Sequence, residues 1–170
     1  MSPCVLWIDE VEKAIAQDNN DSGVSRRILG TLLTWMAENK RAVFIVATAN
    51  EMERLPPELI RKGRLDEIFF VDLPSPVVRA AIYEVHLAKR GHGADGFDMD
   101  ALVNETHGFS GAEIEQAIVS ATYRAREKGR ILATEDILEE AKATRPLSVV
   151  MSERIDRLRL WARERTVPAD

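Results

Sequence analysis

The sequence predicts an α/β fold: a parallel sheet followed by an all-helical subdomain. Before Pro76, apolar and β-branched runs alternate with helical patterns, the arrangement typical of parallel strands joined by crossover helices. After Pro76 the apolar residues recur only at helical spacing, and no convincing strand follows. The length of 170 residues suits one domain with a small subdomain.

The first half of the chain predicts three strands and two helices around a polar loop. The first strand, Val5–Ile8, is a short apolar run of the kind that lies buried. In chain order there follow a polar loop at 14–24, a helix capped by Ser25 and ending near 39–40, a strand within 42–50, a short helix at 55–60 and a strand at 67–74. Pro57 suits the first turn of the short helix.

The second half predicts helices alone. Their expected ranges are 77–90, 99–105, 111–128, 134–143 and 152–165. Ser110 is the expected N-cap of the third, with Glu113 completing a capping box, and Thr134 is the expected cap of the fourth. These patterns predict a helical subdomain and one further C-terminal helix.

Composition excludes several classes of protein. The net charge of −5 argues against a general nucleic-acid binder. No segment approaches the length of about 18 apolar residues that a membrane span needs, and the N-terminus lacks a signal-peptide layout. We interpret the single cysteine, Cys4, as a small core residue of a protein from a reducing compartment. A soluble, cytoplasmic protein is expected.

Two adjacent acids, Asp9 and Glu10, follow the first predicted strand. The carboxyl edge of a parallel sheet is where open α/β folds bind ligands. In phosphoryl transfer, an acid there holds Mg²⁺ through its water shell, and a second acid orients the attacking water as a base. The two acids would equally suit a solvated loop that caps the next helix.

Asn50 ends the second apolar run, where its amide could hydrogen-bond a phosphate or the attacking water, although asparagine is also a common turn residue. Arg61 and Arg64 flank Lys62-Gly63 between the short helix and the third strand. Guanidinium groups suit phosphate oxygens, and an arginine supplied in trans can accelerate nucleotide hydrolysis. A surface cluster paired with nearby acids is the alternative.

The order and spacing of these features resemble the AAA family of AAA+ ATPases over roughly residues 3–143. The segment WIDE resembles the Walker B motif, ATAN resembles sensor 1, and LPPELIRKGRLDEIFFVDLP is similar to the second region of homology. The segment GFSGAEIEQA resembles the start of the sensor-2 helix of the lid. WIDEVEK, LTWM and the tail TRPLSVVMSERIDRLRLWARER are similar to a subgroup of bacterial, cyanobacterial and plastid AAA proteins.

The resemblance implies Mg²⁺-dependent ATP hydrolysis coupled to remodelling of a protein substrate that the sequence does not identify. Asp9 would hold the metal, Glu10 would activate water, and Asn50 would align it. Arg61 and Arg64 match the paired arginine fingers, which implies a closed homo-oligomeric ring, a hexamer. Gly111 and Ala112 would pack near the adenosine end of the nucleotide, and Ala112 stands where other branches carry a sensor-2 arginine.

The chain departs from the family pattern because no Gly-x-x-x-x-Gly-Lys-Ser/Thr segment, the phosphate-binding P-loop, occurs in its 170 residues. We therefore expect a partial P-loop NTPase fold: residues 1–75 as the carboxyl half of the ATPase core, 76–145 as the helical lid and 146–170 as a C-terminal helix. The chain alone should be inactive and should expose an apolar sheet edge. The alternative is a non-hydrolysing interaction module that docks on full-length AAA subunits.

Overall fold

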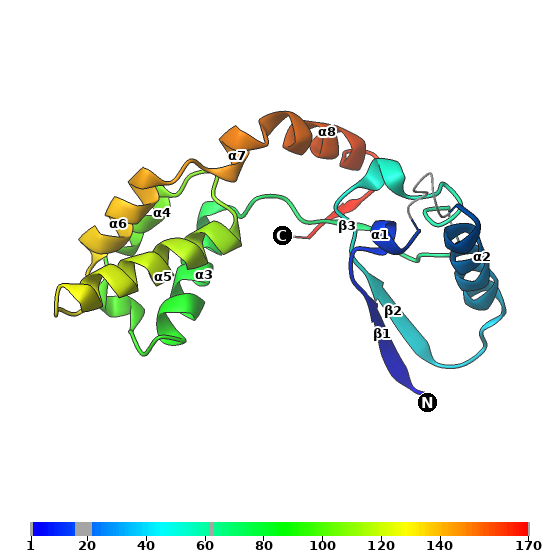
Figure 1. The fold of residues 1–170 in the computed structure, drawn as a ribbon, viewed down its shortest axis with the longest axis horizontal. Coiled ribbons are helices and arrows are strands. Elements are labelled where there is room, and N and C mark those ends of the chain that lie inside the picture. The colour runs from blue at the N-terminus through cyan, green and yellow to red at the C-terminus, as the bar shows by residue number, and fades with distance from the viewer. Residues whose placement is uncertain (1, 16–21, 62, 170) are drawn as a thin grey trace. The chain divides into compact units, whose positions relative to one another are not determined.

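The computed structural model describes residues 2–15, 22–61 and 63–169. The chain divides into two compact units, Met1–Ile68 and Phe69–Asp170. The first contains a small parallel sheet with helices, and the second is almost wholly helical (Figure 1). The predicted class, a partial α/β ATPase fold followed by a helical lid, is confirmed.

The first unit is built on two parallel strands joined through a helix. Its elements are β1 (Cys4–Ile8), α1 (Val11–Ile15), α2 (Ser22–Glu38), β2 (Val43–Ala47) and the 3₁₀ helix η1 (Met52–Arg54). The predicted cap Ser25 lies inside α2, which begins three residues earlier. Of the predicted polar loop, residues 16–21 lie outside the described part of the chain.

The pairing of β1 with β2 sets the geometry of this unit. The strands run parallel, with Cys4 opposite Val43 and Ile8 opposite Ala47. Figure 1 shows them side by side, with α2 lying between them in the chain. A parallel pair needs a crossover of this kind, since the chain must return to its starting end. Both strands therefore end at the same edge of the sheet.

Only the carboxyl end of β1 is packed, because every residue of this strand is exposed except Ile8, which is half-buried. Ile8 packs against an apolar cluster whose buried members are Val11, Ile15, Leu55 and Leu59, with Leu29, Leu32, Leu33 and Met36 of α2 packed against them. On the opposite face Val5, Trp7 and Phe44 are 67%, 61% and 67% exposed. The first strand was expected to be buried, so this prediction is wrong for all of β1 but its last residue.

Cys4 is exposed, which corrects its interpretation as a core residue. It lies at the start of β1, away from the buried cluster around α1. An apolar strand is buried only where a layer of structure covers it, and the described residues of the first unit cover only the carboxyl end of β1. The hydropathy of a strand does not show whether another layer of structure covers it, so the exposure of Cys4 could not be predicted from the sequence.

Two further predictions in this unit are corrected. The short helix expected at 55–60 is only a turn, in which Leu59 donates its N–H to the Pro56 carbonyl at 2.9 Å. Pro56 and Pro57 remove two backbone donors in succession, and Gly63 then adopts a left-handed conformation with φ of 92°. The strand expected at 67–74 is shortened to β3 (Phe69–Phe70) and lies in the second unit.

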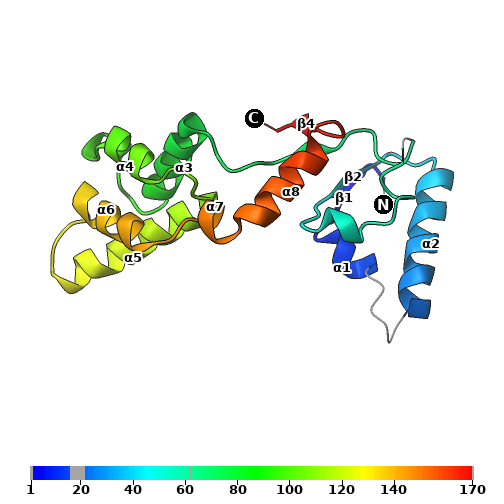
Figure 2. The same cartoon turned by 90° about the horizontal axis from the view of Figure 1, so that it is seen from above.

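The second unit is a helical assembly. Its helices are α3 (Pro76–Ala88), η2 (Ala94–Gly96), α4 (Met99–Glu105), α5 (Gly111–Glu127), α6 (Thr134–Ala143), α7 (Leu147–Val150) and α8 (Ser152–Ala162). Figure 2 shows α3 to α6 grouped together, with α5 beside α6. Their core is formed by residues that are almost fully buried, among them Tyr83, Leu87, Leu102, Ile114, Ile118 and Ile137.

Local capping begins α5 as predicted but begins α6 differently. Ser110 Oγ accepts a hydrogen bond from the N–H of Glu113 at 3.4 Å, and a carboxylate oxygen of Glu113 accepts one from the Ser110 N–H at 2.7 Å. The prediction that Thr134 caps α6 is wrong, because Ala133 occupies the N-cap position. Asp136 accepts the Ala133 N–H at 3.1 Å, while the Thr134 hydroxyl accepts the N–H of Asp98 at 3.0 Å.

The C-terminal segment is tied back to the start of the second unit. Arg159 on α8 forms a bidentate pair with Asp72, with Nε and Nη2 donating to the carboxylate at 2.8 and 2.9 Å. Residues Val167–Pro168 form a short strand, β4, parallel to β3, a strand that the sequence did not predict. The partial burial of Asp72 by itself would raise the pKa of its carboxyl group. The hydrogen bonds from Arg159 and from the Leu73 N–H outweigh this effect, so the pKa of Asp72 is lowered.

Gly108 should be intolerant of any side chain. Its φ of +78° favours glycine, and a Cβ there would lie 2.9 Å from Ser148 Cβ and closer still to the Ser148 hydroxyl. We expect Gly108→Ala to reduce the free energy of unfolding by about 2 kcal/mol or more in a urea titration. Gly96→Ala is the control: its Cβ would meet no atom within 4 Å and its φ is ordinary. Equal effects of the two substitutions would contradict the assignment.

The ion pair of Asp136 with Arg130 should make the stability of the second unit depend on acid. Asp136 is 1% exposed, and the hydrogen bonds from Arg130 hold its pKa below the ordinary value of 3.8. A lowered native pKa stabilises the fold above the unfolded pKa, and this contribution is lost as the pH falls below 3.8 through the native pKa.

Thermal melting of wild type, Asp136→Asn and the exposed control Asp100→Asn from neutral pH downward tests this assignment. Asp136→Asn should be less stable at pH 7 and show a flatter dependence on pH, whereas Asp100→Asn should follow wild type. A profile for Asp136→Asn that runs parallel to wild type would show that the pair contributes nothing.

Candidate functional site

The ends of β1 and β2 bring polar side chains together from positions about 40 residues apart in the chain. Asp9 directly follows β1, and Thr48 directly follows β2. The Thr48 hydroxyl donates to Asp9 Oδ1 at 2.5 Å and accepts the N–H of Glu10 at 2.9 Å. We call Asp9, Glu10, Thr48 and Asn50 the strand-end cluster.

Glu10 occupies an unusual backbone conformation at the centre of this cluster. Its φ is +48°, in the left-handed region that a residue with a Cβ enters at a cost of about 1 kcal/mol. The next residue, Val11, begins α1 and is held beside the end of β2, because its N–H donates to the Thr48 carbonyl at 2.9 Å. This sharp turn directs the Glu10 carboxylate toward Asn50, whose Nδ2 donates to Glu10 Oε1 at 3.0 Å.

Glu12 holds the backbone of Asn50 through a hydrogen bond. Its side chain is 1% exposed, and its Oε1 accepts the backbone N–H of Asn50 at 3.1 Å. Within the described residues, Oε2 of Glu12 is buried without a hydrogen-bond partner. Burying a carboxyl group is costly, and the hydrogen bond from the Asn50 N–H offsets part of that cost while it holds the loop that carries Asn50.

The strand-end cluster fits a magnesium ion held through water. The described residues contain no group of three or more His, Cys, Asp or Glu side chains able to enclose a metal ion. Mg²⁺ does not need such a cage, since it keeps several waters and binds one or two carboxylates together with substrate phosphates. Asp9 is exposed, and the Thr48 hydroxyl donates to its Oδ1, so Oδ2 would be the oxygen that accepts a hydrogen bond from a metal-bound water.

The other predicted site residues lie apart from these contacts. Arg61 is exposed, in the segment that follows the Pro56–Pro57 turn. Arg64 is half-buried, and within the described residues its Nη1 is buried without a hydrogen-bond partner. Gly111 and Ala112 form the first turn of α5 in the second unit, beside the Ser110 cap. Within the first unit, no hydrogen bond between described residues joins Arg61 or Arg64 to the cluster.

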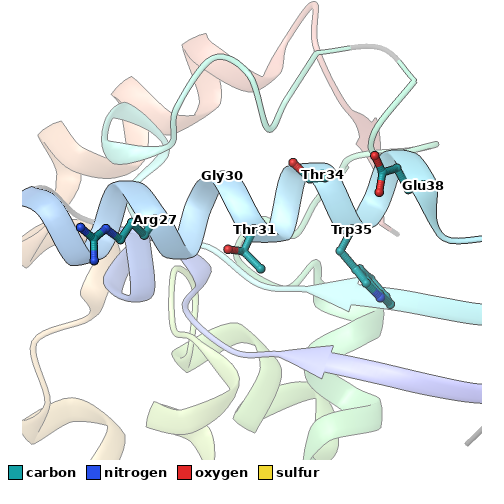
Figure 3. Close-up of a pocket in the computed structure, with 6 residues that line it drawn as sticks. All are labelled: Arg27, Gly30, Thr31, Thr34, Trp35 and Glu38. Atoms are coloured by element: carbon teal, nitrogen blue, oxygen red, sulfur yellow. The ribbon is translucent and has the colours of Figure 1, made fainter.

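A separate hollow of about 600 Å³ runs along α2. It is lined by Arg27, Gly30, Thr31, Thr34, Trp35 and Glu38 (Figure 3). All six residues belong to one helix, in which Arg27 lies within the helix and Glu38 is its last residue. None of them is a carboxylate or amide of the strand-end cluster, so the hollow is not part of that site.

Comparison with known families identifies both units. Residues 1–73 match the family described as ATPase family associated with various cellular activities, and residues 96–140 match the AAA+ lid domain. The chain belongs to the AAA family of ATPases. The described residues of this AAA chain include no helix long and apolar enough to cross a membrane.

The AAA domain-containing protein ycf46 of Guillardia theta is 46% identical to this chain over 165 residues, which make up 95% of the chain and 33% of the relative. The proteasome-activating nucleotidase of Aeropyrum pernix is 34% identical over 146 residues, 81% of the chain and 35% of that protein. The chain thus spans about a third of the length of these AAA relatives.

Solved structures agree in fold. The AAA domain of FIGL-1 superposes with a TM-score of 0.75 at 19% identity, covering 96% of this chain and 57% of that one. The same domain in complex with ADP gives 0.75 at 20% identity, covering 95% and 57%. At this identity the likeness concerns the fold alone.

Sequence reasoning missed two members of this AAA site. Thr48 lies inside the quoted segment ATAN, yet only the register of β1 against β2 places its hydroxyl between Asp9 and the Glu10 N–H. In the sequence, Glu12 does not stand out from the other acids near it. Its position two residues after Glu10, on the buried side of a short helix, is the feature that could have identified it.

Thr48→Val should weaken the junction between the two strands. The substitution keeps the shape of the side chain but removes one donor to Asp9 and one acceptor for the Glu10 N–H. We expect a loss of about 1–2 kcal/mol in the free energy of unfolding, measured by urea titration. Thr34→Val, at an exposed position of α2, is the matched control and should change stability little. A neutral Thr48→Val would show that the hydroxyl does not hold the turn.

Proposed function

We propose that this AAA chain supplies the Walker B, sensor 1 and arginine-finger portion of a module that hydrolyses ATP to ADP and phosphate. The observation that carries the proposal is the strand-end cluster, in which two carboxylates and an amide meet at the carboxyl edge of a parallel sheet. That edge is the usual ligand site of open α/β folds. The family match supports the same activity.

Each member of the cluster has a distinct chemical role in the proposal. Asp9 holds Mg²⁺ through water; when bound, the ion neutralises charge on the phosphates. Glu10 takes a proton from the attacking water, and Asn50 orients that water beside it, consistent with the 3.0 Å hydrogen bond between their side chains. Thr48 keeps Asp9 and the Glu10 backbone in register.

The arginines and the lid complete the proposed assembly. Arg61 and Arg64 reach the nucleotide of a neighbouring subunit in a hexameric ring, which suits the exposed position of Arg61. Gly111 and Ala112 pack near the adenosine end of the nucleotide. Residues 1–75, 76–145 and 146–170 act as partial ATPase core, lid and C-terminal helix of a cytoplasmic protein that remodels a protein substrate.

A hydrolysis assay with Mg²⁺-ATP tests the proposal. The 170-residue chain contains no P-loop motif, so we expect no turnover above background from it alone. The polypeptide that joins these residues to a P-loop segment should hydrolyse ATP, and Glu10→Gln should lower kcat by roughly 10²–10⁴-fold. The control Glu58→Gln, an exposed acid of the same unit, should retain wild-type turnover.

Two outcomes would contradict this assignment. Turnover by the 170 residues alone, abolished by Glu10→Gln, would show that no P-loop is needed. Hydrolysis by the joined polypeptide that survives Glu10→Gln would remove Glu10 from the chemistry.

A second function, a non-hydrolysing module that docks on full-length AAA subunits, is favoured by one observation. Val5, Trp7 and Phe44 expose an apolar sheet face that a partner could cover. Co-purification of the chain with a complete AAA protein, together with a change in that protein's ATP hydrolysis, would support this function. Hydrolysis by the partner that is unaltered on mixing would exclude it.

A further inference from the structure

Lys13 contacts the same carboxylate that the proposed function uses as a base. Its Nζ lies 2.6 Å from Glu10 Oε2. The contact follows from the local backbone, because the Lys13 N–H donates to the Glu10 carbonyl at 2.8 Å and forms a single turn. Side chains three residues apart on such a turn lie on one side. The hydrogen bond to Glu10 raises the pKa of Lys13, and the charges of Glu12 and Glu51 act in the same direction.

The Glu10 carboxylate is therefore held on both of its oxygens. Oε2 faces the Lys13 ammonium group, and Oε1 accepts the Asn50 amide at 3.0 Å. The left-handed φ of Glu10 and the Thr48 hydrogen bond to its N–H fix the backbone beneath. A side chain held at the backbone and at both oxygens is not free to turn toward a water molecule.

The Lys13 contact contributes little to fold stability, which points to another role. The Lys13 side chain is 65% exposed and that of Glu10 is 35% exposed. Ion pairs at such positions are weak, because water screens them and both side chains lose freedom. An interaction of this size is large enough to bias two positions of a carboxylate yet small enough to break in every turnover.

We propose that Lys13 is a positioning residue that restrains Glu10 in a resting position, and that Glu10 becomes the base only when the ion pair between Lys13 and Glu10 breaks. The inference rests on the proposed function. In the released state, a proton passes from the attacking water to a Glu10 oxygen while the water oxygen bonds to the γ-phosphorus. The bond from that phosphorus to the bridging oxygen breaks, and ADP leaves with the electron pair. Lys13 takes no part in these bond changes.

The test measures ATP hydrolysis by the polypeptide that joins these residues to a P-loop segment, with wild type beside Lys13→Ala, Lys13→Arg and Lys40→Ala. Lys13→Ala should raise kcat about two- to five-fold, the range that an exposed ion pair of this strength allows, with KM for ATP unchanged. Lys13→Arg keeps the charge and should retain the wild-type kcat. Lys40→Ala removes an exposed lysine of the same unit that forms no ion pair with Glu10, and should also match wild type.

Salt provides a readout that a merely structural role would not move. Raising the ionic strength from about 0.05 to 0.5 M screens exposed charges. It should raise the kcat of wild type toward that of Lys13→Ala, so that the ratio of the two approaches one. The comparison cancels any effect of salt that both proteins share.

The outcomes distinguish a failure of the proposed ATP hydrolysis from a failure of the Lys13 restraint alone. Wild type without hydrolysis would overturn the proposed function, and the restraint with it. Wild type that hydrolyses ATP while Lys13→Ala leaves kcat unchanged, or lowers it, would overturn the restraint alone. A Lys13→Arg variant as fast as Lys13→Ala would likewise overturn it, because the charge would then not be what holds Glu10.

Discussion

The parallel register of β1 against β2 is the constraint on which the rest of the first unit depends. With Ile8 opposite Ala47, the residues that follow each strand meet at one edge, and Asp9 comes to lie against Thr48. A shift by one residue would turn every side chain to the other face of the sheet. It would also part the two acids from the threonine hydroxyl, so the register determines the site as well as the core.

Strain and hydrogen bonding are balanced at Glu10. The left-handed φ of this residue costs about 1 kcal/mol, and a net contribution of similar size comes from the Thr48 hydroxyl that accepts its N–H. The side chain is then held by Lys13 and Asn50.

The second unit depends on close backbone approach and on caps. The segment 108–113 combines a left-handed Gly108 with the Ser110–Glu113 capping box, and Glu113 Oε1 also accepts the Leu147 N–H at 2.8 Å. One carboxylate thus joins the start of α5 to the start of α7. The Asp72–Arg159 pair then ties α8 to the segment before α3. These contacts join the C-terminal helices to the earlier segments of the second unit.

The sequence by itself determined the α/β class, the ranges of α4, α5 and α6 to within a residue, the capping box at Ser110 and the family to which the chain belongs. These features depend on local spacing, which the order of residues records directly. It also placed Asp9, Glu10 and Asn50 at strand ends, and the structure brings Glu10 and Asn50 into contact. The roles of these residues, and those of Arg61, Arg64, Gly111 and Ala112, stay predictions.

Only the tertiary structure decided the features that depend on neighbours distant in the chain. Cys4 and Trp7 looked like core residues, yet they are exposed because burial depends on which layer covers a strand. The short helix predicted at 55–60 is a turn in the structure, an outcome that local spacing did not indicate. The register of the strands brings the Thr48 hydroxyl to the Glu10 N–H. The turn that follows the strained Glu10 brings the Lys13 ammonium group to the Glu10 carboxylate. Spacing along the chain does not contain those contacts, because they exist only once separate segments lie side by side.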